Sequence, residues 1–326
     1  MKIRKILMII ILFLISGGNR MLESAEGESG IGTLMLDSYG AREIGLGDTF
    51  TGIADDINTM SVNAGGLNTL KRMQGSIMYM RYPAELSFTY LSFGMPIPKE
   101  YMAGYGGISA AFFSIGDEQE YDENGNATGN SLTGGDMVIT LGYGNNVLKF
   151  FGMREELNAG INIKYIHSSL GTETGGGIGF DIGVLYKIDV YNFGKKIRKN
   201  LGIGISLQNI GTSIKYEKEG TSLPQNFRIG AGYKGYKDRD NSITAGFDIN
   251  IPNDGKTIMS IGIEYSWLNT VYGRIGYKIS GPEAENISFG IGGRYMLMKK
   301  EIGFDYALVP LSDIGVTHTF SIGVKW

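Results

Sequence analysis

Three observations on the sequence predict an all-β fold, a transmembrane antiparallel β-barrel of about 14 strands. Apolar and polar residues alternate from about residue 74 to the last residue, Trp326. In the ten clearest strands, the apolar face of this alternation carries no charge. The one long apolar run, near the N-terminus, has ten residues, fewer than the roughly 18 that a membrane-spanning helix needs. Strands are therefore the elements expected to cross the membrane.

The alternation has the two-residue period of a β-strand. Leu157, Ala159 and Ile161 are apolar, whereas Asn158 and Gly160 between them are polar or small. Successive side chains of a strand point to opposite faces, so such a segment has one apolar and one polar face. The same period predicts fourteen strands, at residues 74–81, 86–95, 104–116, 135–145, 157–168, 176–188, 200–208, 226–234, 242–251, 257–267, 270–279, 286–298, 300–308 and 316–326.

Charged residues lie on only one face of the ten strands from residue 157 onward. None of the 50 residues assigned to the apolar face is charged, whereas 12 of the 44 on the opposite face are. A lysine or arginine that faces lipid near the membrane centre costs about 2–4 kcal/mol, which explains this exclusion. The apolar face is therefore predicted to contact lipid. The polar face is predicted to line a lumen that contains Lys164, Asp181, Lys187, Arg228, Lys234, Asp248, Glu264, Arg274, Lys278, Arg294, Asp305 and Lys325.

A secreted β-sandwich would also alternate, and three features favour a membrane barrel over it. Gly, Ser and Thr predominate on the polar face, which suits a crowded lumen. Tyr and Trp gather at strand ends, where an aromatic girdle would meet both bilayer interfaces. The last strand ends in Trp326 and so resembles the signal that the outer-membrane assembly machinery recognises. Because an open sheet edge would leave backbone groups unpaired in lipid, the sheet is expected to close.

The N-terminus has the pattern of a secretory signal peptide. Lys2, Arg4 and Lys5 precede the apolar run of residues 6–15, and small residues follow it. We predict a signal peptide over residues 1–25, cleaved within 18–25. A buried N-terminal helix fits the basic flank less well. A signal peptide followed by a barrel indicates the bacterial outer membrane, with outer-membrane lipid as a partner.

The composition argues against enzymes and nucleic-acid-binding proteins. The net charge of −3 provides no broad basic surface for nucleic acid. There is no cysteine, and both histidines, His167 and His318, share the parity of lipid-facing residues, away from any lumenal nucleophile. The acidic residues between 117 and 123 lack EF-hand spacing and fit a solvated hairpin loop better than a calcium site. No catalytic, cofactor-binding or metal site is predicted.

Several segments resemble a known group of outer-membrane proteins. They are residues 40–56 (GAREIGLGDTFTGIADD), 121–126 (YDENGN), 208–211 (QNIG), 223–230 (LPQNFRIG) and 305–318 (DYALVPLSDIGVTH). In this order they resemble the PorV/PorQ and UPF0164 families, which are similar to the long-chain fatty-acid transporters of the FadL type. The resemblance implies a fourteen-stranded barrel plugged by its N-terminal segment.

The resemblance divides the chain into three parts. A signal peptide occupies residues 1–25, an N-terminal hatch or plug 26–73, and the outer-membrane barrel 74–326. Residues 53–60 of the hatch are expected to form one or two helical turns. The predicted gating residues of the hatch are Asp55, Asp56, Asn63, Gly65 and Gly66. At 63–66 the chain reads Asn-Ala-Gly-Gly where the family has Asn-Pro-Ala-Gly, so a looser plug is expected.

The resemblance and a plugged barrel together predict passive transport of hydrophobic or amphipathic small molecules, such as fatty acids. Ligand would pass by hatch movement or through a lateral gap, for which Gly104, Gly106 and Gly107 are candidates. The alternative is a PorV-like docking or shuttle barrel for secreted cargo proteins, acting through loops at 117–134, 209–225 and 309–315. A third interpretation is a structural or antigenic surface barrel. No cofactor is predicted for any of them.

Overall fold

The structure, a computed structural model, describes most of the predicted barrel and part of the predicted hatch. The described residues are 35, 38–83, 86–98, 100–101, 103–121, 127–148, 156–171, 173–192, 195–215, 220–237, 240–253, 255–279, 285–311 and 315–326. The predicted signal peptide lies outside these residues. None of the described helices is long and apolar enough to cross a membrane.

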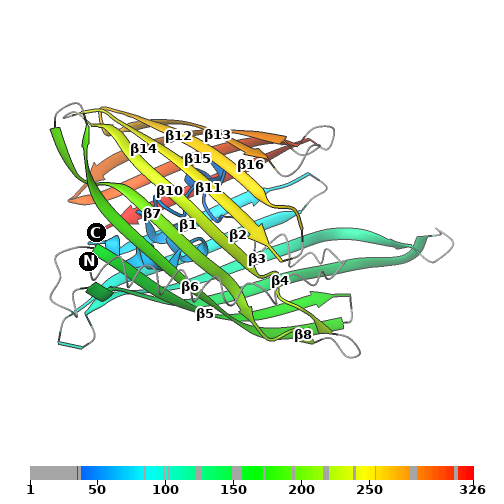
Figure 1. Ribbon diagram of the computed structural model, residues 1–326. Helices are drawn as coiled ribbons and strands as arrows, with labels where there is room; N and C mark the ends of the chain where they lie inside the picture. Colours follow the sequence, from blue (N-terminus) through cyan, green and yellow to red (C-terminus); the bar gives the residue numbers. More distant parts are fainter. Residues whose placement is uncertain are drawn as a thin grey trace.

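The described strands form one closed antiparallel barrel (Figure 1). The sheet has 16 strands, but β8 (Ile214–Lys215) and β9 (Gly220–Thr221) pair only with β6 and with each other, which leaves 16 − 2 = 14 in the ring. The ring closes because β1 pairs with both β2 and β16, and β5 with both β4 and β6. The prediction of fourteen strands is confirmed. The other strands are β1 (Gln74–Arg81), β2 (Ser87–Ile97), β3 (Gly104–Tyr121), β4 (Ala127–Asn146), β5 (Glu156–Leu170), β6 (Glu173–Asn192), β7 (Lys195–Gly211), β10 (Asn226–Lys237), β11 (Ser242–Pro252), β12 (Ile258–Trp267), β13 (Val271–Ile279), β14 (Glu285–Leu297), β15 (Lys300–Leu311) and β16 (Gly315–Lys325).

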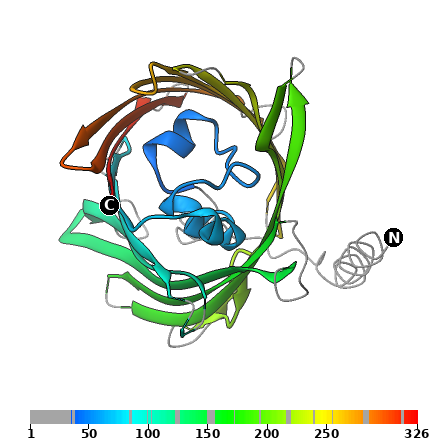
Figure 2. The same ribbon diagram turned by 90° about the vertical axis from the view of Figure 1, so that its left-hand side faces the viewer.

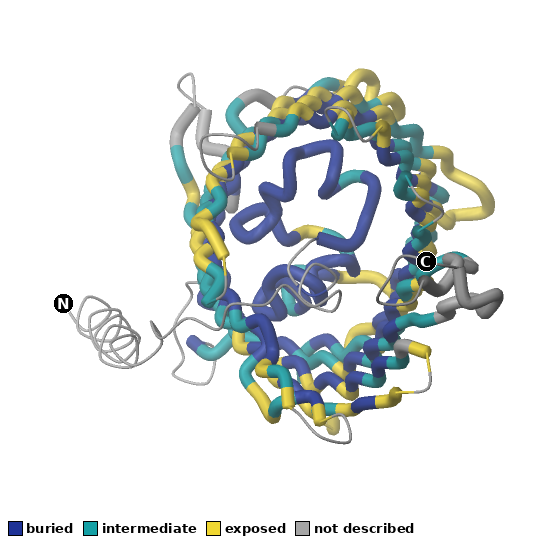
Figure 3. The backbone as a smooth tube through the Cα atoms, turned by 90° about the vertical axis from the view of Figure 1, so that its right-hand side faces the viewer, coloured by how far each residue is buried: buried dark blue, intermediate teal, exposed yellow. Residues whose placement is uncertain are grey.

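The two faces of the barrel wall have the predicted composition. Ile263 and Phe320 point outward and are 45% and 53% exposed, whereas their neighbours Glu264 and Thr319 are buried. Exposed and buried residues alternate along the strands (Figure 3). The apolar outer face is suited to lipid and the polar inner face to a filled lumen.

Several strands are longer than their apolar pattern predicted. The segment 117–134 was expected to be a loop, but β3 continues to Tyr121 and β4 begins at Ala127. Likewise, β6 and β7 extend into the predicted connector 189–199. The predicted loop and connector are wrong because strands that extend beyond the membrane can pair through their backbones without apolar side chains. Polar residues there extend a hairpin without changing the alternation that was used to find the strands.

Tight turns mark one end of the barrel. The turn between β12 and β13 places Leu268 and Asn269 at positive φ, and the turn between β14 and β15 does the same with Met298 and Lys299. Two consecutive residues at positive φ are typical of two-residue hairpin turns. The C-terminus lies at this end, and the long β3–β4 hairpin projects from the opposite end (Figure 1). In bacterial barrels the short turns face the periplasm, so we name the two ends periplasmic and extracellular.

The described residues between 38 and 73, here called the inner segment, lie inside the ring of strands (Figure 2). They form one turn of α-helix, α3 (Ala41–Gly45), and two 3₁₀ helices, η2 (Ile57–Ser61) and η3 (Ala64–Thr69). Asp56 caps η2 by accepting a hydrogen bond from the amide of Asn58. The helical turns expected over 53–60 therefore begin later, at the residue after this cap.

Candidate functional site

The main chain of the inner segment packs directly against glycines of the barrel wall. A side chain at Gly183 would overlap the main-chain nitrogen of Ala64, and one at Gly204 would overlap the main-chain carbonyl oxygen of Thr51. The same applies along consecutive strands from β5 to β13. We call these glycines the glycine belt: Gly160, Gly183, Gly202, Gly204, Gly232, Gly246, Gly262 and Gly276. Because they have no Cβ atom, two backbones approach here more closely than other residues allow.

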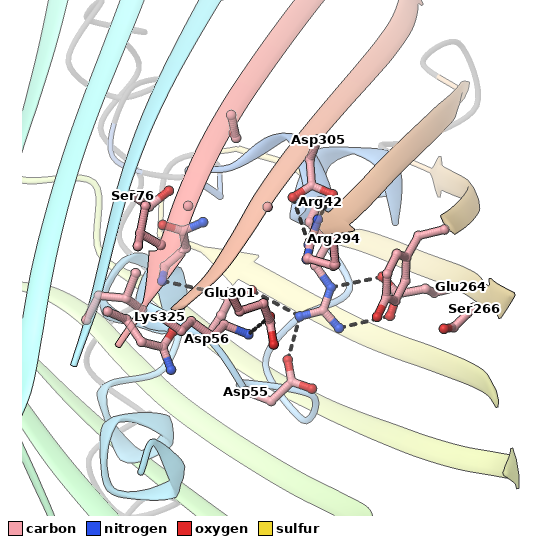
Figure 4. A pocket seen from close by; sticks show the side chains of 18 of the residues that line it. Arg42, Asp55, Asp56, Ser76, Glu264, Ser266, Arg294, Glu301, Asp305 and Lys325 are labelled. Atoms are coloured by element: carbon pink, nitrogen blue, oxygen red, sulfur yellow. Dashed lines mark hydrogen bonds and ion pairs between the residues drawn. The ribbon is translucent and has the colours of Figure 1, made fainter. Parts of the chain in front are cut away.

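An ion-pair network joins the inner segment to the wall near the periplasmic end (Figure 4). Arg42 of α3 donates to Asp55 Oδ1 at 2.6 Å and to Asp56 Oδ2 at 3.0 Å, both in the inner segment. It also forms a bidentate pair with Glu264 of β12, with both N···O distances 2.9 Å. Bidentate pairs of this kind fix geometry as well as charge.

The network continues around the wall through β13, β14 and β15. Arg274 donates to Glu264 at 2.7 Å and to Asp305 at 2.8 Å. Asp305 also accepts from Arg294 at 2.8 Å. Beside these groups lies a polar cavity of about 170 Å³, lined also by Glu301 and Lys325. The periplasmic part of the lumen is therefore polar and strongly charged.

Asp248 of β11 holds the middle of the inner segment. Its Oδ2 accepts from the amides of Phe50 and Thr51, at 3.1 and 2.9 Å, and from the Thr51 hydroxyl at 2.6 Å. Arg228 lies 3.8 Å from the same carboxylate and donates to the carbonyl oxygen of Asp48. Buried main-chain groups need such partners because water does not reach them.

A β-bulge in β7 supplies a further anchor. Phe180 pairs with Ile210 while Ile182 pairs with Leu207, so two residues of β7 face Asp181 alone. One of the two, Asn209, has φ of 59°. Its side-chain amide donates to the carbonyl oxygen of Met35 at 3.2 Å, ahead of the inner segment, and accepts from Lys164 Nζ at 2.6 Å. Lys164 is also paired with Asp181 at 2.9 Å. The QNIG segment of the sequence thus positions the chain that enters the lumen.

The structure brings all five residues predicted for the hatch into contact with their surroundings. Asp55 and Asp56 belong to the Arg42 network. Asn63 caps η3 by accepting from the amide of Gly65, and its amide donates to the carbonyl oxygens of Thr51 and Val184. Gly65 lies against the backbone of β5 and β6, and Gly66 against the Thr59 hydroxyl. These contacts fix the position of the segment. A gating role for the five residues remains a prediction.

Arg42 and Glu43 are site residues that the sequence interpretation did not select. Glu43 is fully buried, and the amide of Asn58 lies 3.3 Å from its Oε1. Burial inside the lumen and the nearby Asp56 carboxylate raise the pKa of Glu43 well above its usual value. Both residues lie in the GAREIG segment of the resemblance, and Glu264 was among the predicted lumenal charges. A search for an opposite charge to Glu264 in that segment would have found Arg42.

The glycines predicted as a lateral gap lie in an intact part of the sheet. Gly104 pairs with Ile97 of β2, and Gly106 pairs with Met95 of β2 and Tyr143 of β4. A side chain at Gly107 would meet Met60 of the inner segment. In this structure these glycines therefore belong to a continuous ladder, and any opening there requires breaking its hydrogen bonds.

The extracellular half of the lumen contains a buried apolar cluster. Inward-facing residues of several strands form one buried cluster with residues near the start of the described chain, here called the apolar cluster. Tyr39 belongs to it, and the centre of its ring lies 4.9 Å from the ring centres of both Phe88 and Tyr90. About 10 Å³ of free space remains beside it. The cluster contains Met35, Tyr39, Ala41, Ile44, Met78, Met80, Phe88, Tyr90, Ala111, Val138, Ile166, Ile214, Leu223 and Ala307.

The two histidines are on the outer face, away from this lumen. His318 accepts or donates a hydrogen bond of 2.8 Å between its Nδ1 and the hydroxyl of Tyr306. His167 lies in a shallow depression of the outer surface with Phe112 and Met137. Neither imidazole faces the lumenal carboxylates.

Comparisons with known proteins agree with this architecture. The family model of the type IX secretion system protein PorV matches residues 101–252. The toluene transporter TbuX of Ralstonia pickettii has the same fold, with a TM-score of 0.58 at 11% identity over 89% of this chain and 98% of that chain. The monoaromatic hydrocarbon channel CymD gives 0.57 at 11% identity, covering 89% and 97%. A Pseudomonas aeruginosa FadL homologue gives 0.52 at 9% identity, covering 89% and 98%. No curated protein matches the sequence significantly.

These likenesses show that the chain has the fold of bacterial outer-membrane hydrocarbon channels. The resemblance to PorV is also confirmed, over the part of the barrel from the start of β3 to the end of β11.

The glycine belt predicts that a bulky side chain will displace the inner segment. Gly204→Val would place its side chain where the Thr51 carbonyl lies, whereas Gly273 faces outward with no atom within 4 Å of an added Cβ. We expect Gly204→Val to raise ion conductance in planar bilayers at least several-fold over wild type, and Gly273→Val to leave it unchanged. Equal conductance of folded Gly204→Val and wild type would show that the belt does not seal the lumen.

The Arg42 network predicts that loss of this one cation loosens the inner segment. Removing one partner of a buried ion pair typically costs about 3–5 kcal/mol. We expect Arg42→Met to speed amide hydrogen exchange in residues 41–56 by roughly a hundredfold or more. Arg72→Met, which changes an exposed arginine of the same segment, is the matched control. Unchanged exchange in Arg42→Met would contradict an anchoring role for the network.

Proposed function

We propose that this protein is a passive outer-membrane channel for hydrophobic or amphipathic small molecules of fatty-acid-like chemistry. The observation that carries this proposal is the apolar cluster in the extracellular half of the lumen. A porin lumen is polar, because its contents are water and solutes. An apolar, closely packed lumen favours ligands that leave water when they bind. The fold shared with hydrocarbon channels supports the same choice.

Met35 and Tyr39 occupy the space where such a ligand would bind. Both are buried in the apolar cluster, and Asn209 donates a hydrogen bond to the main-chain carbonyl oxygen of Met35. A ligand entering from the extracellular end would replace these two side chains in contact with Phe88 and Tyr90. Displacing the Met35 and Tyr39 side chains exposes little apolar surface to water if the ligand covers the part of the barrel wall that they covered. Entry is therefore an exchange of one apolar occupant for another.

Exit from the cluster requires a second movement. On the periplasmic side of the cluster lies the charged network around Arg42. An apolar molecule cannot cross it without separating charges from their partners. Either the inner segment moves, or the ligand leaves through the wall. An opening at Gly104, Gly106 and Gly107 remains the proposed lateral route, and it would require breaking the pairs of β3 with its neighbours.

Two adjacent alanines of β3 provide the test of this proposal. Ala111 is buried in the apolar cluster, and Ala110 is its neighbour on the outer face. We expect Ala111→Trp to lower uptake of labelled oleate or toluene into cells by about tenfold, because the indole fills the ligand space. Ala110→Trp should transport normally, since its indole meets lipid. Heat-modifiable gel mobility would establish that both variants form the barrel.

Equal uptake by cells with and without the wild-type protein would rule out the channel. Equal uptake by folded Ala111→Trp and wild type would instead show that ligands do not pass through the apolar cluster.

A PorV-like docking barrel for secreted cargo is the second candidate. The PorV match includes the long β3–β4 hairpin at the extracellular end and the β8–β9 hairpin beside β6. Deleting residues 117–133 should abolish pull-down of secreted proteins from the native host in this case, while leaving oleate uptake intact. The reverse result, loss of uptake with cargo binding unaffected, would favour the channel.

A further inference from the structure

The outer face of the barrel carries one described arginine at its extracellular end. Burial alternates at the end of β1, with Met78 and Met80 buried and Tyr79 and Arg81 exposed. Arg81 therefore points outward, toward the bilayer, on a strand whose other outward residues are uncharged. No ion pair joins it to a residue in the described part of the chain. An outward arginine at the end of a strand is tolerated only near the membrane interface.

An outward cation at the periplasmic end has a partner of its own. Lys300 lies at the periplasmic end, beside the tight turn between β14 and β15, with its Nζ 5.9 Å from the ring centre of Trp326. Aromatic rings and cations at an interface often pair in this way. Among the described residues, no aromatic ring forms a cation–π contact with the guanidinium of Arg81. Its charge therefore has no described partner on this face.

Arg81 lies in a polar group formed across two neighbouring strands. It is directly opposite His318 of β16 and Ser87 of β2, and directly opposed residues of an antiparallel ladder share a face. The Nδ1 atom of His318 is engaged by the Tyr306 hydroxyl at 2.8 Å, and this contact does not use Nε2. The Tyr306 ring packs on Phe320 at 5.0 Å. Arg81 and His318 thus lie at the extracellular edge of an aromatic surface that faces the membrane.

We propose that Arg81 and His318 bind a phosphate group of a phosphorylated glycolipid in the outer leaflet. A guanidinium matches phosphate in a bidentate geometry, and an imidazole N–H can add a third hydrogen bond. The aromatic surface of Tyr306 and Phe320 below would contact the acyl chains. Arg81 is at the extracellular end, and the outer leaflet of bacterial outer membranes consists mainly of phosphorylated glycolipid. This assignment rests on the barrel's placement in the membrane and not on the proposed transport activity.

Lipid retention by the purified barrel tests this site. Delipidated protein in neutral detergent would be mixed with diphosphorylated lipid A, dephosphorylated lipid A or phosphatidylglycerol, and retained lipid measured by native mass spectrometry. We expect Arg81→Gln to weaken binding of diphosphorylated lipid A about fivefold, the effect typical of one cation at an anionic surface. His318→Gln should weaken it less, and Arg81→Lys should restore part of the affinity. Lys300→Gln, at the other end, is the matched control and should bind as wild type.

Each outcome decides the proposal. Equal retention of diphosphorylated lipid A by Arg81→Gln and wild type would overturn the site. Loss of retention that is the same for dephosphorylated lipid A would show that phosphate is not the ligand. An equal loss for phosphatidylglycerol would overturn the glycolipid assignment, leaving only a general attraction to anionic lipid. The folded state of each variant is checked by its gel mobility before and after heating.

Discussion

The close approach of two backbones inside the barrel is the constraint on which the rest of the lumen depends. Along consecutive strands the wall presents glycine to the inner segment, so that main chain packs on main chain. Glycine at these wall positions is therefore a packing requirement. This close packing also creates a problem of hydrogen bonding, because the amides and carbonyls of the inner segment lose contact with water. Wall side chains solve it: Asp248 accepts from two successive amides, and Gln208 donates to the carbonyl oxygen of Ser61.

The alternating pattern determined the fold because lipid excludes charge at every outward position. That rule acts on each strand separately. The number of strands, and which residues of each strand face lipid, could therefore be predicted without knowing which strands pair. Strand ends could not, since the rule no longer applies outside the membrane, and β3, β4, β6 and β7 all continue beyond their apolar residues. The helical turns near residues 53–60 could be predicted, but their start after Asp56 was not. The pairing of Arg42 with Glu264 was not, because the residues are 222 positions apart and meet only through the position of the inner segment.

The two halves of the lumen differ in the side chains that contact the inner chain. The difference follows from which part of the chain each half holds in place. The extracellular half contains apolar side chains of the chain's own N-terminal part, which pack on an apolar cluster, and Asn209 binds the main-chain carbonyl of Met35 there. The periplasmic half holds main chain, which needs polar partners, and charged residues supply several of these. Desolvating such charges costs several kcal/mol per ion, and their mutual attraction does little more than offset this cost. The network therefore contributes more to the position of the inner segment than to the stability of the barrel.

The arrangement of charges also determines how the inner segment can leave its position. Arg42 has carboxylate partners within its own segment, Asp55 and Asp56. Glu264 and Asp305 have partners within the wall, Arg274 and Arg294. Within this network, moving the segment away from the wall breaks the single contact between Arg42 and Glu264 and leaves both sides internally paired. Neither side of this network is left with an isolated buried charge, which is the outcome that makes most buried ion pairs expensive to separate. The same movement would also separate Lys278 of β13 from Asp48, which are 2.7 Å apart. The division of the Arg42 network therefore reduces the energetic cost of moving the segment, and the Lys278–Asp48 pair adds to that cost.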